Sequence, residues 1–247
     1  MPISYDTFVP ALCRVFDRLG LGAYLADGRA ERLASLADYL VTENEKYNLT
    51  AVTDEAGIIL KHFADSAAPI PLLPEGARLV DVGCGAGFPS LVLALLRPDL
   101  RVTALDATEK RIRYVAAAAS RIGASNLDAV CMRAEDGARA GGELRESFDV
   151  AVARAVARLP VLCELCLPFV RVGGIFLAMK GSGAAAELEE SKRAIPTLGG
   201  RLVSAAEEAL DNGEGMTITR TSIVISKTAP TPAAYPRHFS KISKKPL

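Results

Sequence analysis

Three alternating glycines, preceded by a carboxylate, are the residues of this chain whose types and spacing best suit the binding of a ligand. Gly83, Gly85 and Gly87 follow Asp81, and Phe88 stands directly after the last glycine. Glycine lets a ligand approach the backbone closely and adopts backbone angles that other residues adopt poorly. The spacing differs from the GxGxxG that brings a helix N-terminus onto a pyrophosphate. A carboxylate beside such a loop suits a cationic ligand better than a diphosphate.

S-adenosylmethionine carries a sulfonium and a free amino group, and it meets these demands. The pattern D-x-G-x-G-x-G over residues 81–87 resembles the first motif of Rossmann-like methyltransferases. An ordinary turn between a strand and a helix is the alternative interpretation of the glycines alone. An NAD-dependent oxidoreductase is disfavoured, because Phe88 stands in place of a final glycine.

The elements that position this loop alternate between strand and helix patterns from residue 78 onward. Short connections rich in glycine and proline separate them, which predicts an α/β fold with a mostly parallel sheet and helices on both faces. The predicted strands are 78–82, 101–106, 127–132, 148–153, 174–179, 201–206 and 217–226, and the predicted helices lie near 89–96, 109–122, 158–170 and 184–195. Asn212-Gly213 is a strong turn signal, so the last two strands are expected to form an antiparallel hairpin. A seven-stranded sheet with an antiparallel last strand is, by resemblance, the class I methyltransferase fold.

The chain divides into three predicted parts. Residues 1–76 form an N-terminal helical extension, with helices expected over 5–19, from an N-cap at Asp27 to Tyr47, and from Glu55 to Ser66. Residues 77–227 form the cofactor-binding methyltransferase domain. Residues 228–247 form a basic tail on or near an RNA-binding face.

Composition narrows the class of protein. The chain has 247 residues and 29 basic against 29 acidic side chains, yet residues 228–247 contain four basic residues and no acid. No apolar run approaches the roughly 18 residues that span a bilayer, and no secretory signal is visible, so a cytoplasmic protein without membrane contact is expected. Five cysteines do not indicate a disulfide framework. Cys163 and Cys166 have CxxC spacing inside an apolar helical pattern, and no metal is expected.

Polar residues at the ends of the predicted strands are the further candidates, since ligands of open α/β sheets bind beyond those ends. Asp106 lies 23 positions after Gly83, near the distance typical of an acid that holds ribose hydroxyls; a helix N-cap or a solvated acid is the alternative. Ala134 and Glu135 follow the third strand, where they could reach an adenine or belong to a surface loop. Two cationic residues, Arg154 and Lys180, close the fourth and fifth strands. A salt bridge to a nearby acid is the alternative for the arginine, and a helix cap or a solvent-facing side chain is the alternative for the lysine.

The chain resembles the bacterial 16S rRNA guanine-N7 methyltransferases known as glucose-inhibited division protein B. The matching pieces spread over most of the chain: 48–53, His62 with Asp65-Ser66, 81–89, 133–135, Arg154-Ala155, Lys180-Gly181, 230–232 and 235–237. The resemblance implies cofactor contacts at Gly83, Phe88, Ala134, Glu135 and Arg154. It also implies methyl transfer from S-adenosylmethionine to N7 of a specific guanine in 16S rRNA, as naked RNA, small ribosomal subunit or assembly particle.

Guanine N7 has a lone pair and no proton to lose, so this reaction requires no general base. We therefore expect no catalytic acid or base, with Arg154 at most an orienting group, and catalysis through placement of the two reactants. A small-molecule methyltransferase, and a non-catalytic RNA-binding assembly factor that keeps the fold, are the alternatives.

Two groups of residues are expected to meet the RNA. His62, Asp65 and Ser66 share one helix face and could line the pocket of the target base, although a structural histidine is the alternative for His62. The second group suits contact with phosphates and bases, with a merely solvated C-terminus as its alternative. It comprises Lys180 and the tail residues Tyr235, Arg237, Lys241, Lys244 and Lys245.

Overall fold

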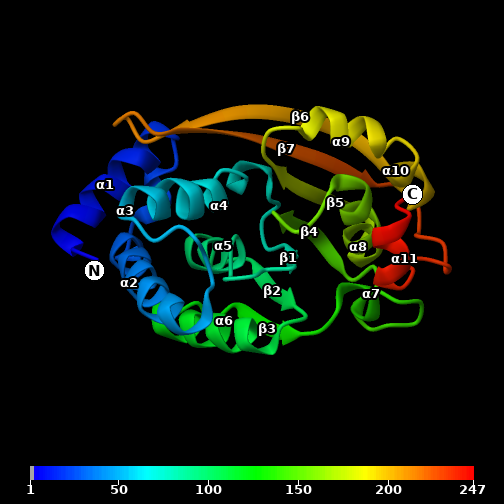
Figure 1. Cartoon of the computed structure of the whole chain (residues 1–247), viewed down its shortest axis with the longest axis horizontal. Coiled ribbons are helices and arrows are strands. Elements are labelled where there is room, and N and C mark those ends of the chain that lie inside the picture. Colours follow the sequence, from blue (N-terminus) through cyan, green and yellow to red (C-terminus); the bar gives the residue numbers. More distant parts are fainter. Residues whose placement is uncertain (1–2) are drawn as a thin grey trace.

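A seven-stranded sheet forms the centre of the computed structural model, which describes residues 3–247 (Figure 1). Its strands are β1 (Arg78–Val82), β2 (Arg101–Asp106), β3 (Leu127–Cys131), β4 (Phe148–Arg154), β5 (Val170–Lys180), β6 (Gly200–Asp211) and β7 (Thr217–Lys227). Their order is β3-β2-β1-β4-β5-β7-β6; β7 is antiparallel to both of its neighbours, β5 and β6, and the other neighbouring pairs are parallel. The predicted fold class and hairpin are confirmed. The strand order reverses between β1 and β4, which is the point where such sheets bind ligands.

Alternate residues of the central strands point to opposite faces of the sheet, and each face carries its own buried cluster. Leu79 and Val152 belong to the cluster that includes α5 (Ser90–Leu96) and α6 (Glu109–Ile122). Val80 and Ala153 belong to the other cluster, together with α8 (Leu159–Cys166). Both faces of β1 and β4 are therefore buried, which explains why these strands are almost continuously apolar.

The N-terminal helices share the cluster of α5 and α6. They are α1 (Tyr5–Arg18), α2 (Arg29–Tyr47), α3 (Glu55–Gly57) and α4 (Asp65–Ala67), with a π-helical stretch, Ile58–Ala64, between the last two. Phe8 of α1 meets Phe63 edge to face, with ring centroids 6.1 Å apart. The prediction of Asp27 as the N-cap of α2 is wrong. Asp27 and Gly28 both have positive φ, and the helix begins at Arg29 without a side-chain cap.

Other predicted boundaries are also corrected. The helix expected over 158–170 ends at Cys166, and a 3-10 turn (Leu167–Phe169) leads into β5, which begins four residues earlier than expected. The helix expected over 184–195 is two helices, α9 (Ala184–Glu190) and α10 (Ala194–Thr197). A short helix, α7 (Ala134–Gly137), occupies the candidate loop after β3. The remaining 3-10 helices are Gly22–Leu25 and Ile70–Leu72.

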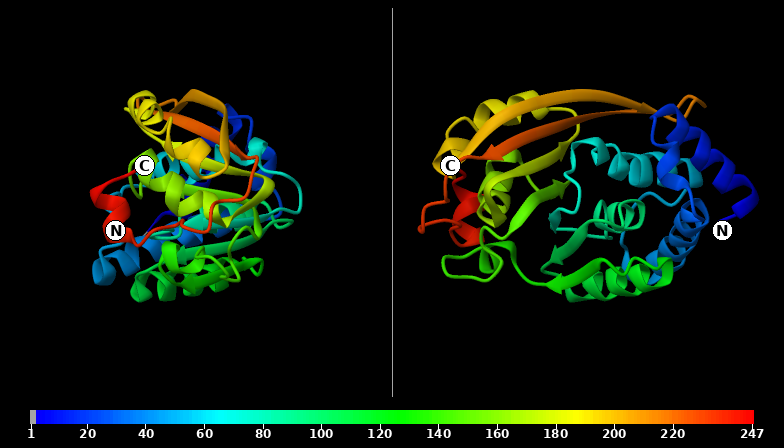
Figure 2. Two further views of the ribbon diagram at one scale, coloured as in Figure 1. Left: turned by 90° about the vertical axis from the view of Figure 1, so that its right-hand side faces the viewer. Right: turned by 180° about the vertical axis from the view of Figure 1, so that it is seen from behind.

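The long β6–β7 hairpin reaches across the molecule to the N-terminal helix α1 (Figure 2). Two ion pairs join its tip to α1: Arg18 to Asp211 at 2.7 Å and Arg14 to Glu214 at 3.1 Å. The C-terminal tail ends in α11 (Phe239–Lys244), whose Ile242 is buried in the cluster around α8.

No helix among residues 3–247 has the length and apolar character needed to cross a membrane. Cys163 and Cys166 are fully buried in the cluster of α8, where burial raises the pKa of both thiols.

Candidate functional site

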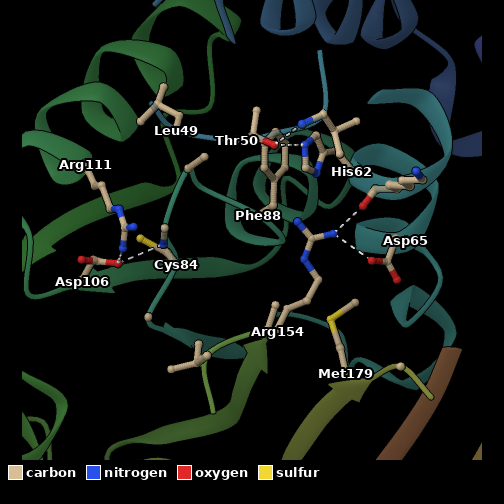
Figure 3. A pocket seen from close by; sticks show the side chains of 18 of the residues that line it. Leu49, Thr50, His62, Asp65, Cys84, Phe88, Asp106, Arg111, Arg154 and Met179 are labelled. Carbon is tan, nitrogen blue, oxygen red and sulfur yellow. Dashed lines mark hydrogen bonds and ion pairs between the residues drawn. The ribbon is translucent and has the colours of Figure 1, made fainter. Parts of the chain in front are cut away.

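A cavity of about 780 Å³ opens at the carboxyl ends of the parallel strands (Figure 3). The loop after β1, the end of β2, the end of β4 and the end of β5 all line it, as do the segment 49–52 and the π-helical stretch before α4. The cavity therefore lies where the strand order reverses, at the position expected for a ligand site of this kind of sheet.

The glycine loop has the backbone conformation that its sequence predicts. Gly83, Gly85 and Gly87 have φ of +78°, +57° and +84°, which L-residues with side chains rarely adopt. A Cβ atom at Gly83 would lie 2.7 Å from Cγ2 of Val156, and one at Gly87 would collide with Leu91. A Cβ at Gly85 would meet nothing within 4 Å, so the backbone there faces open space.

Asp81 lies beneath the loop and not in the lining of the cavity. Its side chain is fully buried, and Oδ2 accepts a hydrogen bond of 3.1 Å from the backbone N–H of Ser90 at the start of α5. Oδ1 has no partner among the described residues, and burial raises the pKa of the carboxyl to about 6. Direct contact of Asp81 with a ligand stays a prediction, and its observed contact stabilises the turn from β1 into α5.

Asp106 lines the cavity at the end of β2 and holds the glycine loop. Its Oδ2 accepts from the Gly85 N–H at 3.1 Å and from Arg111 at 3.5 Å, and Oδ1 accepts from the Thr108 N–H at 2.8 Å. These bonds use both lone pairs of Oδ2 and one of Oδ1, so Oδ1 can also accept a hydrogen bond from a ligand.

Ala134 and Glu135 begin α7 and do not line the cavity. Glu135 is 7% exposed, and its Oε1 has no partner among the described residues. A buried carboxylate oxygen without a donor is costly, which makes this position a candidate for a hydrogen bond from a ligand that enters beside α7.

His62 and Phe88 form the apolar wall of the cavity. Their rings are parallel, with centroids 4.6 Å apart, and Nε2 of His62 lies 2.9 Å from Oγ1 of Thr50. Burial lowers the pKa of His62 to about 4, and the nearby Arg154 cation is the second largest cause. The imidazole is therefore neutral at pH 7.

Asp65 holds two arginines from distant strands. Its Oδ2 accepts from Nη1 of Arg154 at 2.9 Å, and its Oδ1 accepts from Nε of Arg220 at 2.9 Å (Figure 3 shows the first of these). The same Nη1 of Arg154 donates to the backbone oxygen of Lys61 at 2.8 Å. Ser66, predicted on the same helix face, is fully buried outside the lining of the cavity, and its hydroxyl has no partner among the described residues.

Lys180 lines the cavity at the end of β5 with its charge already paired. Nζ lies 2.7 Å from Oε2 of Glu187 and donates to the backbone oxygen of Ala157 at 2.9 Å. The alternative of a solvent-facing lysine is wrong, because the side chain of Lys180 is buried and paired.

The C-terminal tail lies outside the cavity, since none of its residues lines it. Arg237 is bound to the fully buried Glu164 of α8 through its backbone N–H and its guanidinium, at 2.6–3.2 Å. The backbone oxygen of Tyr235 accepts from Arg145 at 2.8 Å. By contrast, three lysines of the tail are exposed; they are Lys241, Lys244 and Lys245.

Several lining residues lie outside the set of site residues that the sequence predicts. Thr50 stands in a loop that Asn44 holds through three hydrogen bonds of 2.6–3.0 Å, and the motif 48–53 was the available signal for it. Ala155 has φ of +56°, an unusual conformation at the end of β4. Five further lining residues carry no local sequence pattern that marks them: Lys61, Arg111, Val156, Met179 and Arg220.

The sheet order, the antiparallel β7 and the glycine loop at the strand reversal define a Rossmann-like class I methyltransferase. The structure of M. jannaschii TYW2 in complex with AdoMet has a similar fold, with a TM-score of 0.53 at 14% identity over 66% of this chain and 75% of that one. The family model of rRNA small subunit methyltransferase G, GidB, matches residues 29–211, and the chain belongs to this family.

Full-length relatives agree with this assignment. The ribosomal RNA small subunit methyltransferase G of Clostridium beijerinckii is 42% identical over 92% of this chain and 94% of its own length. The protein of the same name from Geobacillus thermodenitrificans is 47% identical over 85% of this chain and 87% of its own length. The resemblance inferred from the sequence motifs is confirmed.

Proposed function

We propose that this chain transfers a methyl group from S-adenosylmethionine to N7 of one guanine in 16S rRNA. The observation that carries the proposal is the open backbone of the glycine loop at the strand reversal, in a chain whose relatives are named for this RNA. The cofactor supplies an electrophilic methyl group on a positively charged sulfur.

The residues around the loop fit such a cofactor. Open space at Gly85 leaves room for it against the backbone, and Oδ1 of Asp106 retains a lone pair for a ribose hydroxyl. The unpartnered Oε1 of Glu135 supports a role for α7 in holding the adenine side, together with the neighbouring Ala134. Phe88 provides an apolar ring beside the loop.

The reaction needs no general acid or base, because N7 has a lone pair and loses no proton. The task of the chain is to orient the guanine and to exclude water, and placement of this kind is worth up to about 7–11 kcal/mol. Arg154 suits an orienting role, since Asp65 and the carbonyl of Lys61 fix its guanidinium.

A neutral His62 also suits methyl transfer from a cation. A protonated imidazole beside the sulfonium would repel it, and burial together with Arg154 keeps the pKa of His62 near 4. His62 thus contributes an uncharged aromatic surface next to Phe88, on which a base can stack.

The proposal includes RNA contact by fewer residues of the tail than the sequence predicts. Arg237 is engaged with Glu164, and the three exposed lysines of α11 and its end remain available for phosphates. A triple Lys241→Gln, Lys244→Gln, Lys245→Gln variant should weaken RNA binding and reduce its salt dependence, with unchanged cofactor affinity. Equal RNA affinity of the variant and the parent would remove the tail from the RNA-binding surface.

Two measurements test the proposed function. Calorimetry should detect binding of S-adenosylmethionine and of its demethylated product, and absence of both would refute the proposal at its first step. Mass mapping should then find one N7-methylguanosine in 16S rRNA from cells that contain the protein, and not from cells that lack it. Activity on a small molecule without RNA would favour the small-molecule alternative.

A further inference from the structure

The cavity carries more positive than negative charge. Five cationic side chains line it: Lys61, Arg111, Arg154, Lys180 and Arg220. Three carboxylates pair with them. Arg111 is paired with Asp106, Lys180 with Glu187, and the two remaining arginines share Asp65. Two positive charges are therefore left over, one from the arginine pair and one from Lys61.

Lys61 is the cation of this set without an acidic partner in the described part of the chain. Its side chain is partly exposed, and only its backbone oxygen takes part in the polar contacts of the site, as the acceptor for Arg154. A lysine without an acidic partner, in the lining of the same cavity as two arginines, raises the positive potential there and so attracts an anion.

Arg220 also retains donor capacity. Nε is bound to Asp65 and Nη1 donates to the backbone oxygen of Thr219 at 3.2 Å, whereas Nη2 has no partner within residues 3–247. A guanidinium whose position is fixed by a carboxylate loses little freedom when it binds an oxyanion, and arginine matches the geometry of phosphate oxygens.

The position of Arg220 separates it from the glycine loop. It belongs to β7, three strands away from β1 in the order β1-β4-β5-β7. At roughly 4.8 Å per strand, the backbone at Arg220 lies on the order of 14 Å from the strand that carries the glycine loop. This wall of the cavity is therefore suited to the methyl acceptor, while the glycine loop and Asp106 are suited to the cofactor.

We propose that Lys61 and Arg220 bind the backbone phosphates that flank the target guanine, and so position its base over the cavity. The proposal rests on the proposed function, because it takes the acceptor to be an RNA nucleotide. Arg154 and Asp65 are positioning residues in this arrangement: Asp65 fixes both guanidiniums, and its single charge leaves one of them uncompensated. A free guanine base, which has no phosphate, would gain nothing from the pair.

Salt dependence of RNA binding tests the proposal directly. The association constant for unmethylated 16S rRNA falls with salt, and a plot of its logarithm against log salt has a negative slope. Each lost phosphate contact should decrease the magnitude of this slope by about 0.7–0.9, measured between about 50 and 200 mM salt. We expect this decrease for Lys61→Gln and for Arg220→Gln. Arg220→Lys, which keeps the cation, should retain the slope. The KM for RNA should rise in both glutamine variants, while calorimetric affinity for S-adenosylmethionine stays unchanged.

Arg14→Gln is the matched control. Arg14 is an exposed cation paired with Glu214 on the N-terminal helix α1, outside the cavity, and its removal should leave the slope unchanged. An equal decrease in this control would mean that general charge, and not the cavity pair, causes the effect, and it would overturn the assignment.

Two further outcomes would also overturn it. Weaker cofactor binding with an unchanged salt slope would assign Lys61 and Arg220 to the cofactor. Unchanged slopes in both glutamine variants, with normal N7 methylation by the parent protein, would refute the phosphate contacts and leave the proposed function intact. If the parent protein neither binds nor methylates 16S rRNA, both proposals fail together.

Discussion

At the scale of the single residue, two constraints exclude a Cβ atom at Gly83: the backbone angle and the space around it. Its φ of +78° disfavours any side chain, and a Cβ there would lie 2.7 Å from Val156, another residue that lines the cavity. Backbone strain of this kind costs about 1–2 kcal/mol, and the collision adds to it. The glycine is needed both for the turn and for the shape of the cavity.

Gly83→Val should therefore weaken binding of S-adenosylmethionine by at least about tenfold, since 1.4 kcal/mol corresponds to a factor of ten. Calorimetry on the folded variant measures this change in affinity. Gly141→Val is the matched control: φ at Gly141 is +75°, and a Cβ there meets nothing within 4 Å. The control should lose similar backbone stability and retain its affinity. Equal affinity of the Gly83 variant and the parent would place the cofactor elsewhere.

Two buried titratable residues near the loop oppose each other in their effect on stability. The folded pKa of His62 falls from 6.5 to about 4, so its contribution is full above pH 6.5 and is lost as the pH falls towards 4. The folded pKa of Asp81 rises from 3.8 to about 6, so its contribution is full below pH 3.8 and is lost as the pH rises through 6. Each contribution is at most about 3 kcal/mol.

Single substitutions should separate the two effects. Asp81→Asn removes the contribution of Asp81, so relative to the parent the free energy of unfolding should rise with pH between 3.8 and 6. His62→Gln removes the contribution of His62, and relative to the parent the free energy of unfolding should fall with pH between 4 and 6.5. Urea unfolding at several pH values in this window gives both slopes. Difference curves that do not change with pH would mean that neither group titrates as its burial implies.

At the scale of the element, a buried carboxylate is one of the anchors of the tail, beside the buried Ile242 and the bond from Arg145 to the backbone of Tyr235. Glu164 of α8 is fully buried, and Arg237 provides its three donors. Removal of one partner of a buried ion pair leaves an uncompensated charge and costs about 3–5 kcal/mol, whereas an exposed pair contributes about 0–1 kcal/mol.

Arg237→Ala should accordingly lower the free energy of unfolding by about 3 kcal/mol or more, measured by urea unfolding. Arg158→Ala is the control, because Arg158 and its partner Glu190 are both about half exposed, at 59% and 49%. Its loss should be much smaller than that of Arg237→Ala. Similar losses in the two variants would show that the tail does not depend on Glu164. Truncation at residue 237 would combine this loss with any effect on RNA, so substitution of the lysines is the cleaner test.

The elements and the glycine loop could be predicted from the sequence because their signals are local. Strand ends follow apolar runs, and Asn212-Gly213 marks the hairpin turn. The Asp27 cap failed because Gly28, with positive φ, starts the helix one residue later without a side-chain bond. The pairing of Asp65 with Arg220 could not be predicted, since 155 residues separate them and only the order of the strands brings them together.

At the scale of the whole molecule, the N-terminal helices and the sheet share one buried cluster. Phe8 of α1 is fully buried, packs edge to face on Phe63, and belongs to the cluster of α5 and β1. Phe63 in turn lies 6.0 Å from Phe88 of the cavity, centroid to centroid. Because it is packed in this way, the N-terminal helical extension should unfold together with the sheet and not before it.

Phe8→Ala should therefore destabilise the entire chain, by about 3–5 kcal/mol for a fully buried phenylalanine. Unfolding should remain a single transition, with far-ultraviolet circular dichroism and tyrosine fluorescence giving the same midpoint. Tyr5→Ala is the control on the same helix, because Tyr5 is 42% exposed, and it should shift the midpoint little. Two separated transitions in the Phe8 variant would show that residues 1–76 fold independently. A single shifted transition would mean that the helices which carry His62 and Asp65 are held in place by the same core that supports the glycine loop.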